Sequence, residues 1–183
     1  MSSKIINSNI KNCIVGENVI IKNSTLKNCT IKDFCCIFDS NIEGAEICEK
    51  CKIGAYSRIR GNTIILKNSK IGNFVEIKNS IVGENSKIGH LAYVGDAEIG
   101  GDCNIGAGVV FANFDGVNKH KTKIADKCFI GSNSTLVAPL NLARHTFVAC
   151  GSVVTDDSQE FDFIISRNMQ ITKKGYAKKY FKN

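Results

Sequence analysis

The chain has 183 residues, 43% hydrophobic and 22% charged, so it is long enough for one ordinary globular core and too apolar to be intrinsically disordered. No segment stays free of charged residues, Asn and Ser for the length of a membrane span, and the N-terminus lacks the apolar run of a signal peptide. We therefore expect a cytoplasmic protein. The net charge of +7 would suit nucleic acid, a membrane surface or small polyanions, and it does not distinguish among them.

Residues 1–51 carry aliphatic side chains at intervals of five or six residues. A period near six is neither helical nor simple strand alternation, and it is typical of a solenoid in which each six-residue unit supplies a short strand and a turn. We interpret this segment as the first coils of such a solenoid, with a less regular rhythm than the coils that follow. The inward-facing aliphatic residues are Val15, Ile21, Leu26, Ile31, Ile37, Ile42 and Ile47.

Residues 52–155 repeat the pattern more strictly. An aliphatic residue is expected to point into each coil, a small residue two positions earlier also points inward, and Gly, Asn or Asp after the aliphatic residue makes the corner. The sequence therefore predicts an all-β fold, a parallel β-helix, although periodicity alone does not give its handedness. The strictest inward positions are Ile53, Ile59, Ile65, Ile71, Ile77, Ile124, Ile130, Leu136, Leu142, Val148 and Val154.

The rhythm stops once within the solenoid and ends near residue 155. The polar segment 112–123 does not fit the coil wall, so we expect it to project as a loop, where binding groups are commonly carried. Residues 156–183 are expected to form a C-terminal cap and a basic, solvated tail, with a helix between Lys173 and Phe181. The lysines of this tail are Lys173, Lys174, Lys178, Lys179 and Lys182.

Nine cysteines invite a search for metal or redox chemistry, but most fall on the small-residue position of the repeat, where we expect buried, reduced thiols. Cys48 and Cys51 form a Cys-x-x-Cys pair, but no second pair or nearby histidine completes four zinc ligands. The three histidines, His90, His120 and His145, are far apart in sequence, so we predict no metal site. The cysteines at the small-residue position are Cys13, Cys29, Cys35, Cys51, Cys103 and Cys128.

The segment around His90 carries the most specific motif. It reads Ser86-Lys-Ile-Gly-His-Leu-Ala-Tyr-Val-Gly-Asp-Ala-Glu-Ile-Gly100. With the motifs after it, this segment resembles the acetyltransferase domain of the bacterial bifunctional N-acetylglucosamine-1-phosphate uridyltransferase and glucosamine-1-phosphate N-acetyltransferase, a hexapeptide-repeat family, over about residues 52–170. The other motifs are Asn104-Ile-Gly-Ala-Gly108, Asn113-Phe-Asp-Gly-Val-Asn-Lys119, Phe129-Ile-Gly-Ser132, Leu136-Val-Ala-Pro139 and Ser166-Arg-Asn-Met-Gln170.

This resemblance implies a left-handed β-helix that assembles as a homotrimer with active sites at the subunit interfaces. It also implies acetyl-CoA and glucosamine 1-phosphate as substrates, in UDP-N-acetylglucosamine biosynthesis, with direct acetyl transfer and His90 as general base. We add the hypothesis that Glu76 orients His90. The resemblance assigns substrate binding to Arg60, Lys78, Tyr93, Asn104, Asn113 and Lys119. It assigns acetyl-CoA binding to Ala107, Ser132, the backbone near Cys150, and Arg167.

The chain departs from the family pattern at several positions. Phe114 stands where the family usually has Tyr, Cys150 replaces a small residue, and Arg60 is not followed by Pro-Gly, so the sugar specificity stays open. The glycine-rich nucleotide loop and metal-binding carboxylates of a uridyltransferase domain are missing from the sequence. We expect no uridyltransferase activity in this chain, and a separate uridyltransferase would then supply it.

Two alternatives remain open. One is a hexapeptide acetyltransferase for another amino- or hydroxy-sugar, and the other is a non-catalytic trimeric solenoid that acts as a scaffold. Neither nucleic acid nor a membrane is an expected partner, because both proposed substrates are small phosphorylated anions that already account for the positive charge.

Overall fold

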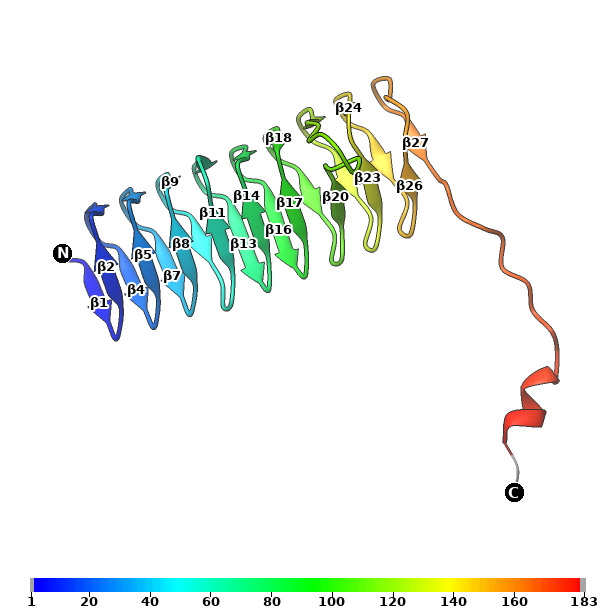
Figure 1. The fold of residues 1–183 in the computed structure, drawn as a ribbon, viewed down its shortest axis with the longest axis horizontal. Helices are drawn as coiled ribbons and strands as arrows, with labels where there is room; N and C mark the ends of the chain where they lie inside the picture. The colour runs from blue at the N-terminus through cyan, green and yellow to red at the C-terminus, as the bar shows by residue number, and fades with distance from the viewer. Residues whose placement is uncertain (1, 182–183) are drawn as a thin grey trace.

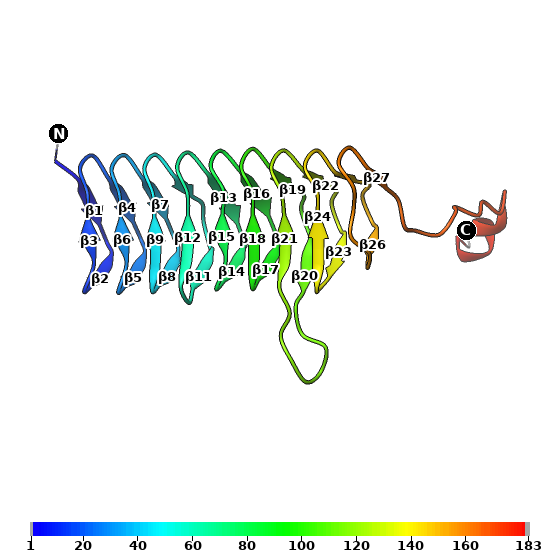
Figure 2. The same cartoon turned by 90° about the horizontal axis from the view of Figure 1, so that it is seen from above.

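The computed structural model describes residues 2–181, and it is a parallel β-helix built from three sheets that run the length of the solenoid (Figures 1 and 2). Each of the first eight coils contributes one short strand to each sheet, and neighbouring strands in a sheet come from successive coils and are parallel. The predicted all-β parallel solenoid is therefore confirmed. Its left-handed sense stays a prediction from the resemblance.

We call the three sheets A, B and C. Sheet A has ten strands, which are β1 (Lys4–Ile6), β4 (Ile20–Lys22), β7 (Cys36–Phe38), β10 (Lys52–Ile53), β13 (Lys70–Asn73), β16 (Lys87–His90), β19 (Asn104–Ile105), β22 (Phe129–Ile130), β25 (Phe147–Val148) and β27 (Phe163–Ile164). Sheet B has nine, which are β2 (Asn9–Lys11), β5 (Thr25–Lys27), β8 (Asn41–Glu43), β11 (Arg58–Arg60), β14 (Glu76–Lys78), β17 (Tyr93–Gly95), β20 (Val110–Ala112), β23 (Thr135–Val137) and β26 (Val153–Val154). Sheet C has eight, which are β3 (Ile14–Val15), β6 (Thr30–Ile31), β9 (Ala45–Ile47), β12 (Thr63–Ile65), β15 (Ile81–Val82), β18 (Ala97–Ile99), β21 (Thr122–Ile124) and β24 (Leu140–Leu142).

The core is a column of aliphatic side chains, one from each sheet in each coil. Ile53, Ile71 and Ile88 stack in register along sheet A, and all three are at most 1% exposed. The inward positions predicted from the sequence are buried, apart from Val15 in the first coil, which is half-buried. Burying one such side chain contributes roughly 1.5–3 kcal/mol, so the stability of the solenoid depends on the stacking of many coils.

The N-terminal coils pair in the same three sheets as the rest. They are shorter, because Lys4, Ile20, Cys36 and Lys52 occupy one register position at intervals of 16 residues, whereas Lys52, Lys70 and Lys87 are 18 and 17 residues apart. The looser rhythm predicted for residues 1–51 thus corresponds to coils with shorter corners.

Small polar residues and cysteines fill the second inward position and connect successive coils. The hydroxyl of Ser86, for example, donates to the carbonyl of Gly100 (2.7 Å) and accepts from the amide of Cys103 (2.9 Å). Cysteines take the same place at Cys29, Cys35, Cys51, Cys103 and Cys128, which are buried as predicted. Cys13, in the first of the described coils, is half-buried.

Two boundaries differ from the sequence predictions. The projecting loop is 113–121, shorter than the predicted 112–123, because Ala112 pairs with Val137 and residues Thr122 and Lys123 pair with β18 and β24 (Figure 2). The wall also continues beyond residue 155, because β27 adds to sheet A next to β25.

The tail extends away from the wall after β27 and ends in a 3-10 helix, η1 (Tyr176–Tyr180), within the segment where a helix was predicted (Figure 1). Lys182, counted with the basic tail, lies outside the described residues. Over residues 2–181, the structure has no helix of the length and apolar character needed to cross a membrane.

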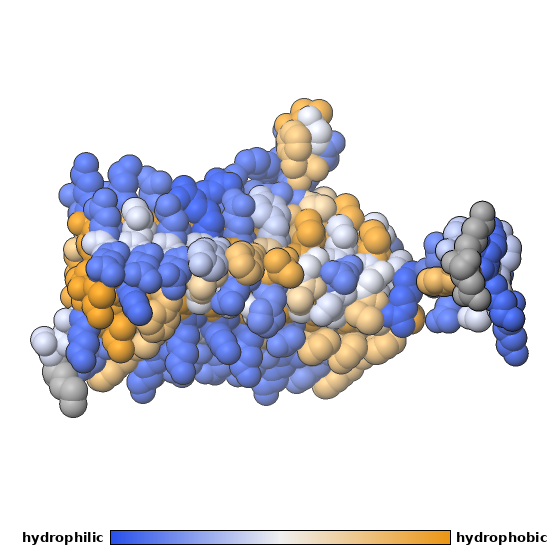
Figure 3. All heavy atoms as spheres, turned by 90° about the horizontal axis from the view of Figure 1, so that it is seen from below, coloured by the Kyte–Doolittle hydropathy of each residue, from blue (hydrophilic) through white to orange (hydrophobic). Residues whose placement is uncertain are grey.

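The outer surface is not uniform. On the face seen in Figure 3, hydrophobic residues gather toward the two ends of the solenoid, and the region between them is mostly hydrophilic with a small hydrophobic row. The loop stands clear of this surface and carries hydrophobic residues at its end. Within the loop, Phe114 is 59% and Val117 is 82% exposed.

Candidate active site

His90 is the last residue of β16, at the corner where the chain turns from sheet A to sheet B. The next residue, Leu91, takes the left-handed conformation of the corner (φ 50°), so His90 itself keeps an extended backbone. Its imidazole is exposed and makes no hydrogen bond with any other described residue. Both ring nitrogens are therefore available to a ligand or to another chain.

A groove of about 730 Å³ runs along the outside of sheet A beside this corner. Four of the residues predicted to bind or react with substrate line it: His90, Asn104, Ala107 and Ser132. Register explains why they meet. Lys87, Asn104, Phe129 and Phe147 occupy one position of sheet A, and the residues three places after Lys87, Asn104, Phe129 and Phe147 are His90, Ala107, Ser132 and Cys150.

Cys150 and Arg167 also come together, at the C-terminal end of this row. The guanidinium of Arg167 donates to the carbonyl of Cys150 and lies 3.4 Å from its sulfur. The four residues predicted to bind acetyl-CoA are thus placed along one edge of successive coils, starting one coil beyond His90.

A second group of predicted residues lies on the outer face of sheet B. The ammonium group of Lys78 lies near that of Lys119, and this neighbouring positive charge lowers the pKa of Lys119. Asn113 donates to Asp96 (2.5 Å), which also accepts from Asn79 (2.6 Å). Burial opposes ionisation of Asp96, but these two hydrogen bonds and the neighbouring lysines outweigh it, and the pKa of Asp96 is lowered.

Tyr93 belongs to this group because Gly95 leaves room for its ring. A side chain at Gly95 would come within 2.5 Å of the Tyr93 hydroxyl oxygen and within 2.7 Å of the Asn113 amide nitrogen. Gly95 was not singled out in the sequence. The signal was present, because Gly95 is part of the motif that carries the resemblance and a glycine within a strand often marks a close approach.

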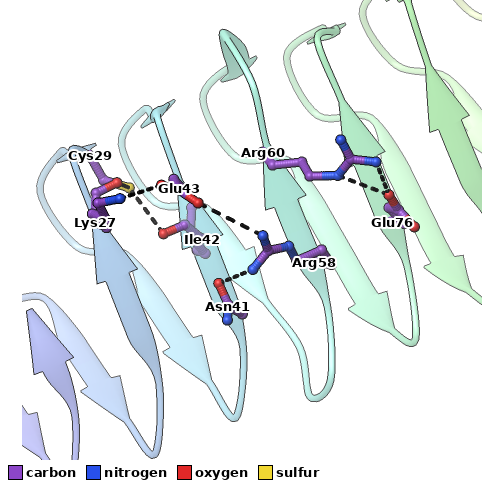
Figure 4. Close-up of polar contacts among 8 residues, drawn as sticks. All are labelled: Lys27, Cys29, Asn41, Ile42, Glu43, Arg58, Arg60 and Glu76. Carbon is purple, nitrogen blue, oxygen red and sulfur yellow. Dashed lines mark hydrogen bonds and ion pairs between the residues drawn. The ribbon is translucent and has the colours of Figure 1, made fainter.

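Glu76 is bonded to Arg60 and not to His90. Its carboxylate accepts from Nη2 (2.7 Å) and Nε (3.1 Å) of Arg60, as Figure 4 shows. The register accounts for this, because Glu76 begins β14 in sheet B and lies opposite Tyr93, whereas His90 ends a strand of sheet A. Within the single chain, Glu76 holds Arg60, and its role beside His90 stays a prediction.

The loop 113–121 is folded on itself around one carboxylate. Asp115 accepts from the amides of Val117 (2.7 Å) and Asn118 (2.6 Å) and from Nε2 of His120 (2.6 Å). These bonds, the amide of Asn118 first, hold the pKa of Asp115 well below its usual range. An antiparallel bridge between Phe114 and Lys119 closes the loop. The sequence analysis missed Asp115, although an Asp followed by Gly is a turn signal.

We expect Asp115→Ala to loosen this loop and thereby weaken binding at Lys119, which lies at its base. With the substrates that the resemblance implies, the Michaelis constant for the phosphorylated sugar should rise about tenfold, while that for acetyl-CoA and kcat change little. Asp115→Asn keeps an acceptor for the two amides and should restore most of the loss. Equal effects of both variants on kcat, with an unchanged Michaelis constant, would contradict this positioning role.

The lowered pKa of Asp115 also predicts a pH dependence of the loop. A carboxylate whose folded pKa is lowered stabilises above its unfolded pKa, about 3.9, and the contribution is lost as the pH falls through the folded pKa. The protection of the Val117 and Asn118 amides, taken relative to their intrinsic exchange rates, should stay constant from neutral pH to about pH 4 and fall below it. Asp115→Asn should show no such step, and the same step in Asp115→Asn would contradict its assignment to Asp115.

Comparisons with known proteins give relatives of the same architecture. The description of the matching family model is "GMPPB C-terminal domain", over residues 43–114. The bifunctional protein GlmU of Limosilactobacillus reuteri is 52% identical over 143 residues, which are 78% of this chain and 31% of that protein. The GlmU protein of Trichormus variabilis is 42% identical over 172 residues, which are 94% of this chain and 35% of that protein. The chain spans about a third of the length of these curated relatives.

Solved structures share the fold at low sequence identity. LpxA, a UDP-N-acetylglucosamine acyltransferase from Bacteroides fragilis, has a TM-score of 0.65 at 19% identity, covering 88% of this chain and 68% of that one. A GDP-perosamine N-acetyltransferase from Caulobacter crescentus, solved with CoA and GDP-perosamine, has a TM-score of 0.53 at 17% identity, covering 61% and 52%. The resemblance predicted from the motifs is confirmed by the GlmU relatives, and the solenoid is a fold that sugar acyltransferases use.

Proposed function

We propose that this protein transfers the acetyl group of acetyl-CoA to the amine of glucosamine 1-phosphate. The observation that carries the proposal is the placement of His90 between two groups of residues. The row Ala107, Ser132 and Cys150 begins one coil beyond it, and sheet B, which follows the corner, carries Tyr93 in β17 with Lys78 opposite Gly95 on the adjacent strand. Two anionic substrates bound to these groups would meet at the imidazole.

The chemistry requires a base and no covalent enzyme intermediate. The amine nitrogen attacks the thioester carbonyl carbon, a C–N bond forms, and the nitrogen gives its proton to a ring nitrogen of His90. The C–S bond then breaks, and the CoA sulfur leaves as a thiolate that takes up the proton. Imidazole suits both steps, because it is the side chain that exchanges a proton near neutral pH. A backbone N–H at the corner would hold the developing oxyanion.

The lysine pair on sheet B provides the site for the sugar phosphate. Lys78 and Lys119 repel each other, as the lowered pKa of Lys119 indicates. A phosphate placed between them removes this repulsion and accepts hydrogen bonds from both. Asp96 and Asn113 hold the base of the loop, so that Lys119 stays over this position.

A homotrimer would complete the site. The ring nitrogens of His90 lack a hydrogen-bond partner among residues 2–181, whereas a general base usually has a group that fixes its orientation. A neighbouring subunit would supply that group, and Glu76 is the residue we propose for it. The projecting loop would reach the neighbour in the same assembly.

The test is to follow release of free thiol when the protein is mixed with acetyl-CoA and glucosamine 1-phosphate. Glucosamine and galactosamine 1-phosphate serve as the matched acceptors, and pyrophosphate release from UTP as the matched reaction that we expect to be absent. Thiol release that depends on glucosamine 1-phosphate supports the proposal. Faster release with another amino sugar would favour the alternative acetyltransferase, and no release with any acceptor and no CoA binding would favour a scaffold.

A further inference from the structure

The outer face of sheet A differs in charge from the other two sheets. None of its ten strands, as the structure describes them, contains an Asp or a Glu, yet they contain five lysines, Lys4, Lys22, Lys52, Lys70 and Lys87. None of these five lysines forms an ion pair with a described residue. The lysines on this face thus lack the direct carboxylate partners that cations on the other two sheets have.

Sheets B and C place carboxylates beside their cations. In sheet B, Glu43 lies 2.8 Å from Lys27 and 3.8 Å from Arg58, and Figure 4 shows how Glu43 and Glu76 link strands of neighbouring coils. On sheet C, Glu98 contacts both Lys121 (2.6 Å) and Lys123 (3.8 Å). The lack of carboxylates on sheet A is thus a property of one face and not of the whole surface.

Three of the lysines form an in-register row, which we call the lysine ladder: Lys52, Lys70 and Lys87. Lys52 lies opposite Lys70, and Lys70 lies opposite Lys87, on the adjacent strands β10, β13 and β16. Neighbouring strands are about 4.8 Å apart, and like charges directly opposite one another destabilise a sheet. A bound anion would turn this arrangement from repulsive to favourable.

The ladder lies in the groove that contains His90. All three lysines line this groove, and the next residue of the same row is Asn104. The side of the groove toward the N-terminus is apolar, because Phe38 and Cys36 line it there. A ligand held by the ladder would therefore lie against an apolar wall at one end and reach His90 at the other.

We propose that the lysine ladder binds the diphosphate group of a nucleotide. Three ammonium groups along two strand spacings can each reach oxygens of two linked phosphates, whereas a single phosphate would leave part of the ladder unused. The apolar end suits the rest of such a ligand. A nucleotide sugar and CoA both carry this group. Occupation by CoA would reverse the direction proposed for CoA along Ala107, Ser132 and Cys150, so the competition below distinguishes the two sources. A role of the ladder in catalysis rests on the proposed function. Binding of a diphosphate to the ladder can be measured without acetyl transfer.

The test is calorimetric titration with inorganic pyrophosphate at low ionic strength. The lysine pair of sheet B would also bind this probe, so the background is the Lys78→Ala/Lys119→Ala variant. In this background, Lys70→Gln should weaken pyrophosphate binding about tenfold, and the triple replacement of the ladder should abolish it. The matched control is Lys22→Gln, an exposed lysine of sheet A outside the groove, which should leave binding unchanged.

Equal binding by the background protein and the ladder variants would overturn the proposal, and so would an equal loss in Lys22→Gln. Competition then identifies the source of the diphosphate. Displacement of pyrophosphate by CoA supports CoA, displacement by UDP-N-acetylglucosamine supports a nucleotide sugar, and displacement by neither overturns the assignment to nucleotides. Because none of these readouts uses acetyl transfer, a failure of the proposed function would show separately, as absence of thiol release by the unmodified protein.

Discussion

Replacing His90 by alanine should lower the turnover of acetyl transfer by roughly 10²–10⁴-fold while the thermal midpoint of unfolding stays the same. The fall in turnover follows from the loss of the group that accepts the proton of the amine. The unchanged midpoint follows from the structure, because the imidazole is exposed, makes no hydrogen bond with a described residue and is not the corner residue with positive φ. The Michaelis constants should change little, since other residues bind both substrates.

The measurement is thiol release at saturating substrates, with the melting curve taken on the same preparations. His145→Asn is the matched control, because His145 is outside the groove and takes a left-handed conformation (φ 59°) that Asn tolerates. This control should keep full turnover. If His90→Ala also turned over at a near-normal rate, His90 would not be the base, and the site would have to be sought elsewhere on the solenoid.

Most of the fold could be predicted because a solenoid repeats one physical rule. An aliphatic residue every five or six positions, followed by Asn, Asp or Gly, gives both the strand and the corner, and Asn68, Asn85 and Asp102 show the result as a chain of side-chain hydrogen bonds along one corner. The rule fails where polar residues are part of a strand. Thr122 and Lys123 look like loop residues, but they join the wall because β18 and β24 offer them backbone partners.

The end of the solenoid was missed for a related reason. The last coil has no strand in sheet C, and its polar segment around Asp157 and Ser158 caps β24 through hydrogen bonds to Asn141 and Ala143. The aliphatic rhythm therefore lapses for most of a turn before β27 resumes pairing in sheet A. A periodic pattern does not show such a resumption, because one strand of two residues is too short to carry a period.

The candidate site was predicted residue by residue, but its arrangement was not. Periodicity gave the corner position of His90, whereas its alignment with Ala107 and Ser132 depends on the register across the coil that carries the loop. The ion pair between Glu76 and Arg60 depends on which strands are neighbours, and the sequence pattern did not predict it. Predicting the lysine ladder requires both the register and the order of the strands. Its three lysines are 17 or 18 residues apart and lie side by side only because their strands pair.

The second large effect that we expect is on stability. Ile105→Asp should lower the thermal midpoint by more than about 10 °C, or prevent folding of the middle coils. Ile105 is 2% exposed and lies in β19, in register between Ile88 and Ile130. An unpaired carboxylate at this place costs several kcal/mol, a large part of the roughly 5–15 kcal/mol by which a domain of this size is stable.

Two variants separate the buried charge from other effects. Ile105→Val removes one methylene group and should cost only about 0.5–1.5 kcal/mol. Val110→Asp places the same charge in the same coil on an outward position that is 40% exposed, and should leave the midpoint nearly unchanged. A midpoint for Ile105→Asp equal to that of Val110→Asp would mean that Ile105 does not point into the core and that the register is wrong.

Unfolding in Ile105→Asp should also be confined to part of the molecule, because each coil contacts only its neighbours. Ile105 lies in the coil that joins the strand of His90 to the strands that carry Ser132 and Cys150. Amide exchange should therefore remain slow in the N-terminal coils, at Ile37 or Ile53, and become fast from Ile105 onward. In such a protein the lysine ladder would remain folded on β10 and β13 while acetyl transfer is lost, because the residues proposed to bind acetyl-CoA would no longer be held in register with His90.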